Sequence, residues 1–244
     1  MTLERLKMIM RRLRDPVHGC EWDRAQDFSS IAPYTIEEAY EVAEAIARND
    51  MDSLADELGD LQLQVVFHAQ MAAEAGHFTV DDVLDRVCDK LEHRHPHIFG
   101  GATSTPGWEA LKATERSVSD DKSALAGVAN ALPALERAVK LQRRAARTGF
   151  DWPDTAGPRA KIVEELQELE VADTQAERTD ELGDLLFAVV NLARKLNIEP
   201  EAALREANRK FERRFRRIEV EPGFEGDLDA KEALWQRTKH DQSV

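Results

Sequence analysis

The sequence predicts an all-α protein made of two similar helical domains in tandem. Apolar residues recur at spacings of three and four, which is typical of helices that bury one face, and runs of β-branched residues with a period of two are absent. An acidic pattern also occurs twice, which indicates an internal repeat. The apolar residues that share helical spacing are Leu54, Leu58, Leu61, Val65 and Phe67 in the first half, and Leu182, Leu185, Leu186, Val189 and Val190 in the second.

The expected helices form two matching sets. In each set the second and third helices contain acidic residues three apart, the fourth a Lys/Arg pair four apart, and the fifth a Trp/Lys pair four apart. Gly, Ser, Thr and Asp concentrate between Gly100 and Pro133, which places a linker near 119–132 between domains 1–118 and 133–244. The helices are expected near 2–14, 34–48, 51–75, 80–94 and 107–118, and near 133–147, 158–172, 177–196, 200–218 and 229–240.

The repeated acidic pattern supplies the main candidate site. The pentapeptide Glu-Leu-Gly-Asp-Leu occurs at Glu57–Leu61 and again at Glu181–Leu185, each time after a Glu-Glu-x-x-Glu run. Residues three apart lie on one face of a helix, so each pair presents two carboxylates to the same side. If the two helices of a half pack together, four carboxylates meet. These are Glu38, Glu41, Glu57 and Asp60 in the first half, and Glu165, Glu168, Glu181 and Asp184 in the second.

Carboxylates that converge in this way require a counter-charge. Two unit charges about 4 Å apart repel each other by roughly 4 kcal/mol at an effective dielectric near 20. A hard divalent cation such as Mg²⁺, with Mn²⁺ as a substitute, prefers oxygen ligands and would offset this repulsion. The alternative is two solvated acidic helix faces, which is the usual explanation of a single E-x-x-E pair. Duplication of the whole pattern favours the metal site.

Basic and aromatic side chains supply candidates for an anion site. Lys210 and Arg214 lie one turn apart in a very basic run, where a shared phosphate would relieve their mutual repulsion; solvated helix charge is the alternative. Lys161 lies one turn before the first acid pair of the second half. Trp235 has a flat face that suits a base or ribose, with Lys239 one turn further on, although simple packing explains this tryptophan equally well.

Composition excludes several classes of protein. With 42% hydrophobic and 33% charged residues, the chain is typical of globular proteins that fold in water. The N-terminal stretch is too charged for a signal peptide, and no stretch approaches the roughly 20 apolar residues that span a membrane. The net charge of −14 argues against a nucleic-acid polymer as partner. Cys20 and Cys88 are too few for a disulfide framework, so a cytoplasmic location is expected.

Six long segments carry a family resemblance. In order, they are IAPYTIEEAYEV (31–42), DELGDLQLQVVFHAQMA (56–72), KLEHRHPHIFG (90–100), KIVEELQELE (161–170), DELGDLLFAVVNLARKL (180–196) and NRKFERRF (208–215). Together they resemble the MazG family of nucleoside triphosphate pyrophosphohydrolases over nearly the whole chain, in the two-domain arrangement of bacterial members. The resemblance implies an all-α NTP pyrophosphatase fold that dimerises into helical bundles. It also implies Mg²⁺-dependent hydrolysis of (d)NTP to (d)NMP and pyrophosphate, in nucleotide-pool control or house-cleaning.

The resemblance also implies roles for individual residues. The Mg²⁺ ligands of the family fall on Glu165, Glu168, Glu181 and Asp184, with Glu38, Glu41, Glu57 and Asp60 as the copies in the first half. Its phosphate- and nucleotide-contacting positions, ATP included, fall on Lys161, Lys210, Arg214, Trp235 and Lys239.

The expected mechanism is metal-assisted hydrolysis. Mg²⁺ held by the carboxylates would neutralise the phosphates and lower the pKa of a water that attacks the α-phosphorus. Lys210 and Arg214 would stabilise charge on the leaving pyrophosphate, and Glu164 or Glu168 would orient the water. Attack at the α-phosphorus is implied by the resemblance and not by residue spacing.

The two halves are expected to be unequal, with the second dominant. The first half has Phe67 where the second has Asn191, and Tyr34 where the second has Lys161, so it lacks a polar group and a cation. Three other classes stay open: a di-iron bundle, which would require Glu-x-x-His where both halves have Asp; a non-catalytic helical regulator; and a nucleic-acid-binding module.

Overall fold

The computed structural model of the chain describes residues 2–100 and 121–240. The chain divides into two compact units, Met1–Thr114 and Glu115–Val244. All regular secondary structure within the two described ranges is helical, which confirms the predicted all-α class. The helix expected near 107–118, with its Trp108 and Lys112, lies outside the described residues, and the limits of the linker stay a prediction.

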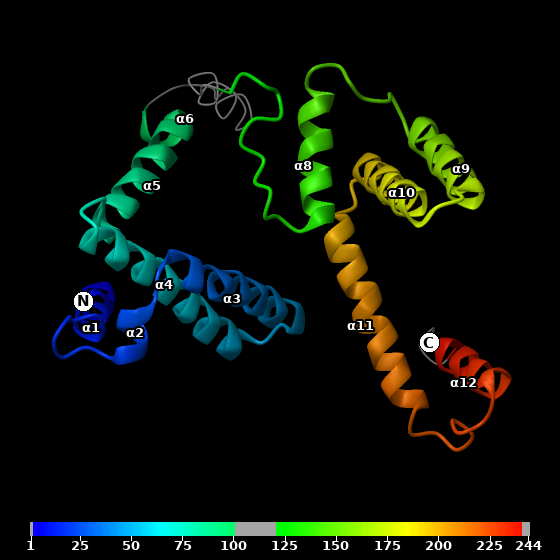
Figure 1. The fold of residues 1–244 in the computed structure, drawn as a ribbon, viewed down its shortest axis with the longest axis horizontal. Coiled ribbons are helices and arrows are strands. Elements are labelled where there is room, and N and C mark those ends of the chain that lie inside the picture. Colours follow the sequence, from blue (N-terminus) through cyan, green and yellow to red (C-terminus); the bar gives the residue numbers. More distant parts are fainter. Residues whose placement is uncertain (1, 101–120, 241–244) are drawn as a thin grey trace. The chain divides into compact units, whose positions relative to one another are not determined.

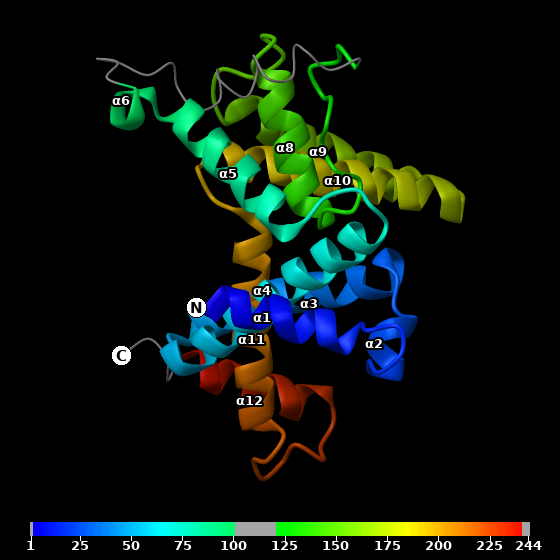
Figure 2. The same ribbon diagram turned by 90° about the vertical axis from the view of Figure 1, so that its left-hand side faces the viewer.

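The first unit is built around a long helical hairpin. Its helices are α1 (Thr2–Leu13), α2 (Glu21–Ala25), α3 (Phe28–Arg48), α4 (Met51–Glu74), α5 (Val80–Arg94) and α6 (Pro96–Phe99). Helices α3 and α4 pack along each other, and α1 lies against α4 (Figures 1 and 2). Met10, Ile31, Val66 and Phe67 form the centre of the buried core, which therefore lies where α1, α3 and α4 meet.

The hairpin ends are fixed by short polar side chains. Helix α3 begins at Phe28, six residues earlier than expected, because the Asp27 carboxylate accepts hydrogen bonds from the N–H groups of Ser29 and Ser30. At the other end Asn49 has a left-handed backbone conformation with φ of 54°, and Asp50 caps α4 directly after it. This tight connection sets the acidic residues of the two helices opposite each other. The short helices α2 and α6 were not predicted.

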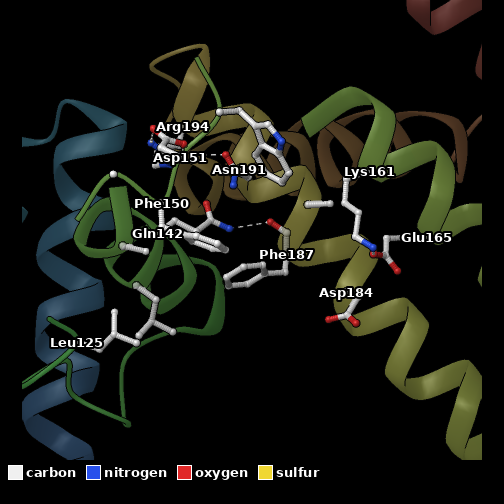
Figure 3. Close-up of a pocket in the computed structure, with 15 residues that line it drawn as sticks. Leu125, Gln142, Phe150, Asp151, Lys161, Glu165, Asp184, Phe187, Asn191 and Arg194 are labelled. Carbon is white, nitrogen blue, oxygen red and sulfur yellow. Dashed lines mark hydrogen bonds and ion pairs between the residues drawn. The ribbon is translucent and has the colours of Figure 1, made fainter. Parts of the chain in front are cut away.

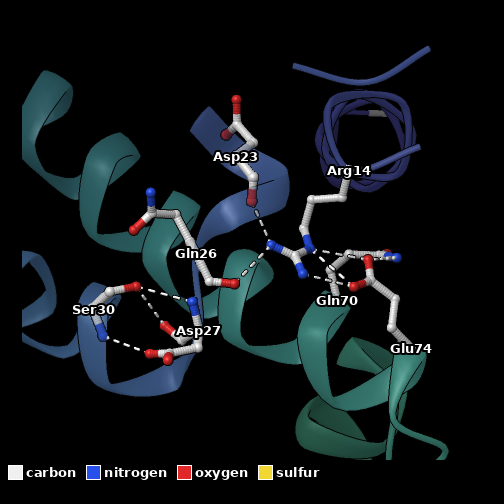
Figure 4. Close-up of polar contacts among 7 residues, drawn as sticks. All are labelled: Arg14, Asp23, Gln26, Asp27, Ser30, Gln70 and Glu74. Atoms are coloured by element: carbon white, nitrogen blue, oxygen red, sulfur yellow. Dashed lines mark hydrogen bonds and ion pairs between the residues drawn. The ribbon is translucent and has the colours of Figure 1, made fainter. Parts of the chain in front are cut away.

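Arg14 joins three segments of the first unit (Figure 4). Its Nε and Nη2 donate to the Glu74 carboxylate at 3.0 and 2.8 Å, which links the end of α1 to α4. Its Nη1 donates to the backbone carbonyls of Asp23 and Gln26 at 2.5 and 3.3 Å. The guanidinium also lies over the ring of Phe67, 5.4 Å from its centroid. Arg14 therefore holds the α2 segment against the core.

The second unit contains a similar hairpin with a different extension. Its helices are α8 (Ala134–Ala146), α9 (Ala156–Val171), α10 (Gln175–Lys195), α11 (Pro200–Ile218) and α12 (Leu228–His240). Thr174 and Glu177 form a reciprocal capping box that starts α10 directly after α9. Helix α8 packs on α10 through Ala138, Val139 and Val190. Helix α11 runs away from the hairpin, and α12 packs against α11 (Figure 1).

The hairpin helices leave much of their apolar surface exposed within the single chain. Phe67 and Val190, from the predicted stripes, are buried, but several of their stripe partners are at least 36% exposed, namely Leu58, Val65, Leu182, Leu186 and Val189. Within the described ranges of each unit, these apolar side chains of the hairpin are therefore left exposed. Within the same ranges no helix is both long and apolar enough to cross a membrane.

Candidate metal and nucleotide site

Three of the four acids predicted for each site converge. In the second unit, carboxylate oxygens of Glu165, Glu168 and Glu181 all lie within 4.8 Å of one another. Glu165 and Glu168 are three residues apart on α9 and face Glu181 on α10, as the spacing predicts. Asp184 is not a member of this group of oxygens; it is exposed and lines the adjacent pocket.

The first unit repeats the same arrangement. Oxygens of Glu38, Glu41 and Glu57 also lie within 4.8 Å of one another, while Asp60 is exposed and outside the group. A Cβ added to Gly59 or Gly183, the glycines between the α4 or α10 acids, would meet nothing within 4 Å. Close helix packing therefore does not explain either glycine within a single unit.

The acids of the second unit perturb one another's titration. Burial, followed by repulsion from neighbouring carboxylates, raises the pKa of Glu168 and of Glu181. The pKa of Glu165 is lowered instead, chiefly because the Lys161 ammonium donates a hydrogen bond to it. Lys161 Nζ lies 2.5 Å from Glu165 Oε1 and 2.8 Å from Glu164 Oε1. Lys161 therefore neutralises part of the negative charge of the group.

The second-unit group fits a divalent cation. Glu165 is only 1% exposed, and its Oε2 is buried without a hydrogen-bond partner among the described residues. A buried carboxylate oxygen without a partner is costly, and a hard cation ligated by Glu165, Glu168 and Glu181 would satisfy it. The donor set contains only oxygen, which suits Mg²⁺ or Mn²⁺ better than a soft metal.

A pocket of about 640 Å³ adjoins the acidic group (Figure 3). Its size lies in the range of small-molecule sites. One end contains Lys161, Glu165 and Asp184, and the remainder is mainly apolar and aromatic. The other lining residues include Gln142, Phe150, Asp151, Trp152, Phe187, Asn191 and Arg194. A ligand with a charged end and a flat apolar end would match this division.

Ionic contacts fix the wall formed by residues 150–152. Arg194 and Lys195 at the end of α10 bind the Asp151 carboxylate at 2.5 and 2.7 Å, and hydrogen bonding from Arg194 is the main reason why the pKa of Asp151 falls to about 2. Trp152 packs against Gly157 at the start of α9 so closely that a Cβ there would overlap the indole ring. Only glycine fits at this position while the ring stays in place.

Four predicted nucleotide-contacting residues do not line this pocket in the single chain. Lys210 and Arg214 lie on α11, and Trp235 and Lys239 lie on α12. The Trp235 ring packs against Phe211, with 5.3 Å between centroids, so within the chain it makes a packing contact. Of the predicted contacts, only Lys161 lies beside the acidic group.

The prediction missed several pocket residues. Trp152 lies in the segment TGFDWP, which has a counterpart, HGCEWD, in the first half, so the repeat was a signal that it mattered. Gln142 and Arg194 had no such signal, because a single glutamine or arginine within a helical pattern is ordinary. Only packing of α8 against α10 brings Gln142 to the pocket.

Aromatic rings occupy the corresponding region of the first unit. Phe67, at the position of Asn191, is 3% exposed. Trp22, the counterpart of Trp152, lies edge-on to Phe67 and to Tyr34, with ring centroids 6.5 and 6.2 Å apart. Tyr34 takes the position that Lys161 has in the second unit. The first unit thus has the same acidic group, with aromatic side chains at the positions that Lys161 and Asn191 have in the second unit.

Comparison with known proteins identifies the family of the chain. The MazG nucleotide pyrophosphohydrolase domain matches residues 26–99, and phosphoribosyl-ATP pyrophosphohydrolase matches residues 132–211. A nucleoside triphosphate pyrophosphohydrolase of Escherichia coli (strain K12) is 47% identical over 98% of this chain and 98% of its own length. The Thermotoga maritima protein named nucleoside triphosphate pyrophosphohydrolase/pyrophosphatase MazG is 50% identical over 90% of this chain and 86% of its own length. The chain belongs to the MazG family of nucleoside triphosphate pyrophosphohydrolases.

Proposed function

We propose that this chain hydrolyses nucleoside triphosphates, (d)NTPs, to (d)NMPs and pyrophosphate, with Mg²⁺ as cofactor. The observation that carries the proposal is the group of Glu165, Glu168 and Glu181, which adjoins through Glu165 a 640 Å³ pocket whose remaining lining is mainly apolar and includes three aromatic rings. A triphosphate suits the charged end and a nucleoside the aromatic end. The names of the two full-length relatives support the same reaction.

The acidic residues and Lys161 have separate roles in the proposed reaction. Glu165, Glu168 and Glu181 would hold the cation, and the nearby Asp184 would supply a further carboxylate to the site. The cation, when bound, supplies charge neutralisation and a water of lowered pKa. Lys161 is beside Glu165 in the structure, close enough to the acidic group that its ammonium would also bind a phosphate oxygen of the substrate. Glu164, which lies beside the group through its contact with Lys161, or Glu168 would orient the attacking water.

Product analysis tests the reaction. With Mg²⁺ we expect NMP and pyrophosphate in equal amounts, and with EDTA no turnover. Release of NDP and orthophosphate would show that the proposed site of cleavage, between the α- and β-phosphates, is wrong. Full activity in EDTA would exclude the metal role. Phosphoribosyl-ATP belongs in the substrate panel because residues 132–211 match that pyrophosphohydrolase.

We further propose that the working enzyme is a homodimer whose sites combine two chains. Apolar side chains on the hairpin are exposed, among them Val163, Leu166, Leu182, Leu186 and Phe187, and a second copy would cover them. Lys210 and Arg214 do not line the pocket of their own chain, although phosphate binding suits them. A partner's α11 would bring them to the triphosphate.

Mixing of two inactive variants tests this arrangement. Glu181→Gln removes a metal ligand, and Arg214→Ala removes a phosphate contact. If sites are shared, a heterodimer of the two has one site with both changes and one intact site, so random mixing should restore about a quarter of wild-type activity. If each chain forms its own site, mixing restores nothing. Each variant alone, carried through the same unfolding and refolding, is the control.

A further inference from the structure

We propose that Gln142 and Asn191 form a donor–acceptor pair that recognises the Watson–Crick edge of the nucleobase in the second-unit pocket. The inference rests on the proposed function, because it assumes that a nucleotide occupies this pocket. It assigns residues to the recognition of the nucleobase, which the acidic group does not recognise. Both residues line the pocket, and both side chains are more than nine-tenths buried, with 5% of Gln142 and 9% of Asn191 exposed.

The orientation of the Gln142 amide is fixed by its partner. Its Nε2 donates to the backbone carbonyl of Phe187 at 2.9 Å. A carbonyl oxygen only accepts, so the nitrogen must face Phe187 and the oxygen must face away. This oxygen, Oε1, is buried and has no hydrogen-bond partner among the described residues. A buried acceptor without a partner is unfavourable and requires an explanation, which a ligand donor would provide.

The Asn191 amide is fixed in the opposite sense. Its Oδ1 accepts from Nη2 of Arg194 at 2.9 Å, and a guanidinium only donates, so the oxygen must face Arg194. Arg194 is held in turn by Asp151. The Asn191 nitrogen therefore points away from Arg194, toward the side of the pocket where Gln142 lies (Figure 3). Asn191 offers the pocket a donor.

The two amides lie on neighbouring positions of the pocket wall. Gln142, on α8, binds the carbonyl of Phe187, which is one turn before Asn191 on α10. Aromatic side chains flank them, because Phe150, Trp152 and Phe187 also line the pocket. Flat apolar walls next to one acceptor and one donor suit a base that stacks and presents its hydrogen-bonding edge.

The pair selects for bases with an intact Watson–Crick edge and does not discriminate among the standard bases. Every standard base has a donor and an acceptor side by side on this edge, such as the amino group and N1 of adenine. A triphosphate whose base lacks the donor leaves Oε1 of Gln142 without a partner. Sites built to hydrogen-bond a substrate group discriminate strongly against analogues without it. The ligand class is therefore a nucleotide with an unmodified Watson–Crick edge.

The test compares ATP with purine riboside 5′-triphosphate, which lacks only the amino group. For the wild-type chain we expect kcat/KM for ATP to be about tenfold higher, the loss typical of one buried hydrogen bond. Gln142→Met keeps the shape and removes the acceptor, so the ratio should fall to about one. Asn191→Asp keeps the bond to Arg194 but replaces the donor by an acceptor, and should lower kcat/KM for ATP by about tenfold. Gln70→Met, in the first unit, is the matched control and should leave the ratio unchanged.

The outcomes separate this inference from the proposed function. If the wild-type chain hydrolyses both triphosphates within twofold of each other, the inference is overturned while the function stands, whatever the variants do. If neither is hydrolysed, the function fails, and binding of AMP against purine riboside monophosphate, followed by Trp fluorescence, decides the inference. Tighter binding of AMP supports it. Equal binding, or no binding of either, contradicts it.

Discussion

The acidic groups of the two units have the same spacing and the same three-oxygen geometry but different immediate neighbours. In the second unit the Lys161 ammonium contacts Glu165 at 2.5 Å, and the pKa of Glu165 is lowered. In the first unit the contact to Glu38 is from the neutral amide of Gln64 at 3.4 Å, and burial raises the pKa of Glu38. A cation beside the acids therefore decides whether the group is partly neutralised before metal arrives.

The second contrast concerns the space beside the acids. Asn191 and Trp152 line a pocket in the second unit, whereas Phe67, Trp22 and Tyr34 contact one another in the first. The described pocket of the first unit, about 310 Å³, has none of the three glutamates in its lining. Under the proposed function, the described residues of the second unit therefore combine the groups for metal ligation and for nucleotide binding, whereas in the first unit aromatic side chains stand at the positions of Lys161 and Asn191.

The largest expected effect comes from comparing Glu181→Gln with Glu57→Gln. Gln keeps the shape and removes the charge, so the pair tests the metal sites and not packing. We expect Glu181→Gln to lower kcat/KM for NTP hydrolysis at least about a hundredfold, because it weakens the binding of the cation that neutralises the triphosphate. Glu57→Gln should lower it less than about threefold, since the pocket described in the first unit does not have Glu57 in its lining. A larger loss from Glu57→Gln would place the main site in the first unit.

Much of the fold was predictable because local rules determine it. The hairpins follow from helical spacing and from polar caps such as Thr174, so the predicted helices lie close to the observed ones. The early start of α3 was missed because Pro33 lies inside the helix, while the Asp27 cap that starts it lies seven residues before the start of the expected range. Short α2 and α6 have too few residues for a periodic signal.

The site was predictable only where spacing along one helix fixes geometry. Glu165 and Glu168 face one way because they are three apart, and the hairpin supplies Glu181. The orientation of Gln142 depends on the carbonyl of Phe187 on another helix, which no spacing rule reveals. Arg214 and Trp235 remain untested as substrate contacts, since family resemblance gave them and the single chain does not bring them to the pocket.

The next prediction exchanges the residue that distinguishes the two pockets. Asn191→Phe imports the first-unit residue, and we expect it to fill the pocket and raise KM for NTPs about tenfold or more, with Mg²⁺ binding retained. Truncation of the residue at the matching position of the first unit acts on stability instead. Phe67 is 3% exposed in the core, so Phe67→Ala should cost about 3–5 kcal/mol of unfolding free energy by urea denaturation. Unchanged KM in Asn191→Phe would show that the nucleotide does not use this pocket.

The smallest expected effect is the dependence of stability on pH without metal. Burial and neighbouring carboxylates raise the pKa of Glu38 and Glu57, so these two groups bind protons more readily in the folded first unit than in the unfolded chain. Their contribution to stability is fully present below the unfolded pKa of about 4.3 and is lost as pH rises through the folded values. In the second unit the lowered pKa of Glu165 opposes the raised values of Glu168 and Glu181, so the slope should be weaker. In EDTA, Tm should fall by on the order of a few degrees between pH 5 and 7, and Mg²⁺ should reverse the fall.

Glu57→Gln should flatten this dependence more than Glu181→Gln, because no lysine contacts the first group in the described residues. An equal slope in both variants would mean that Lys161 does not distinguish the two groups.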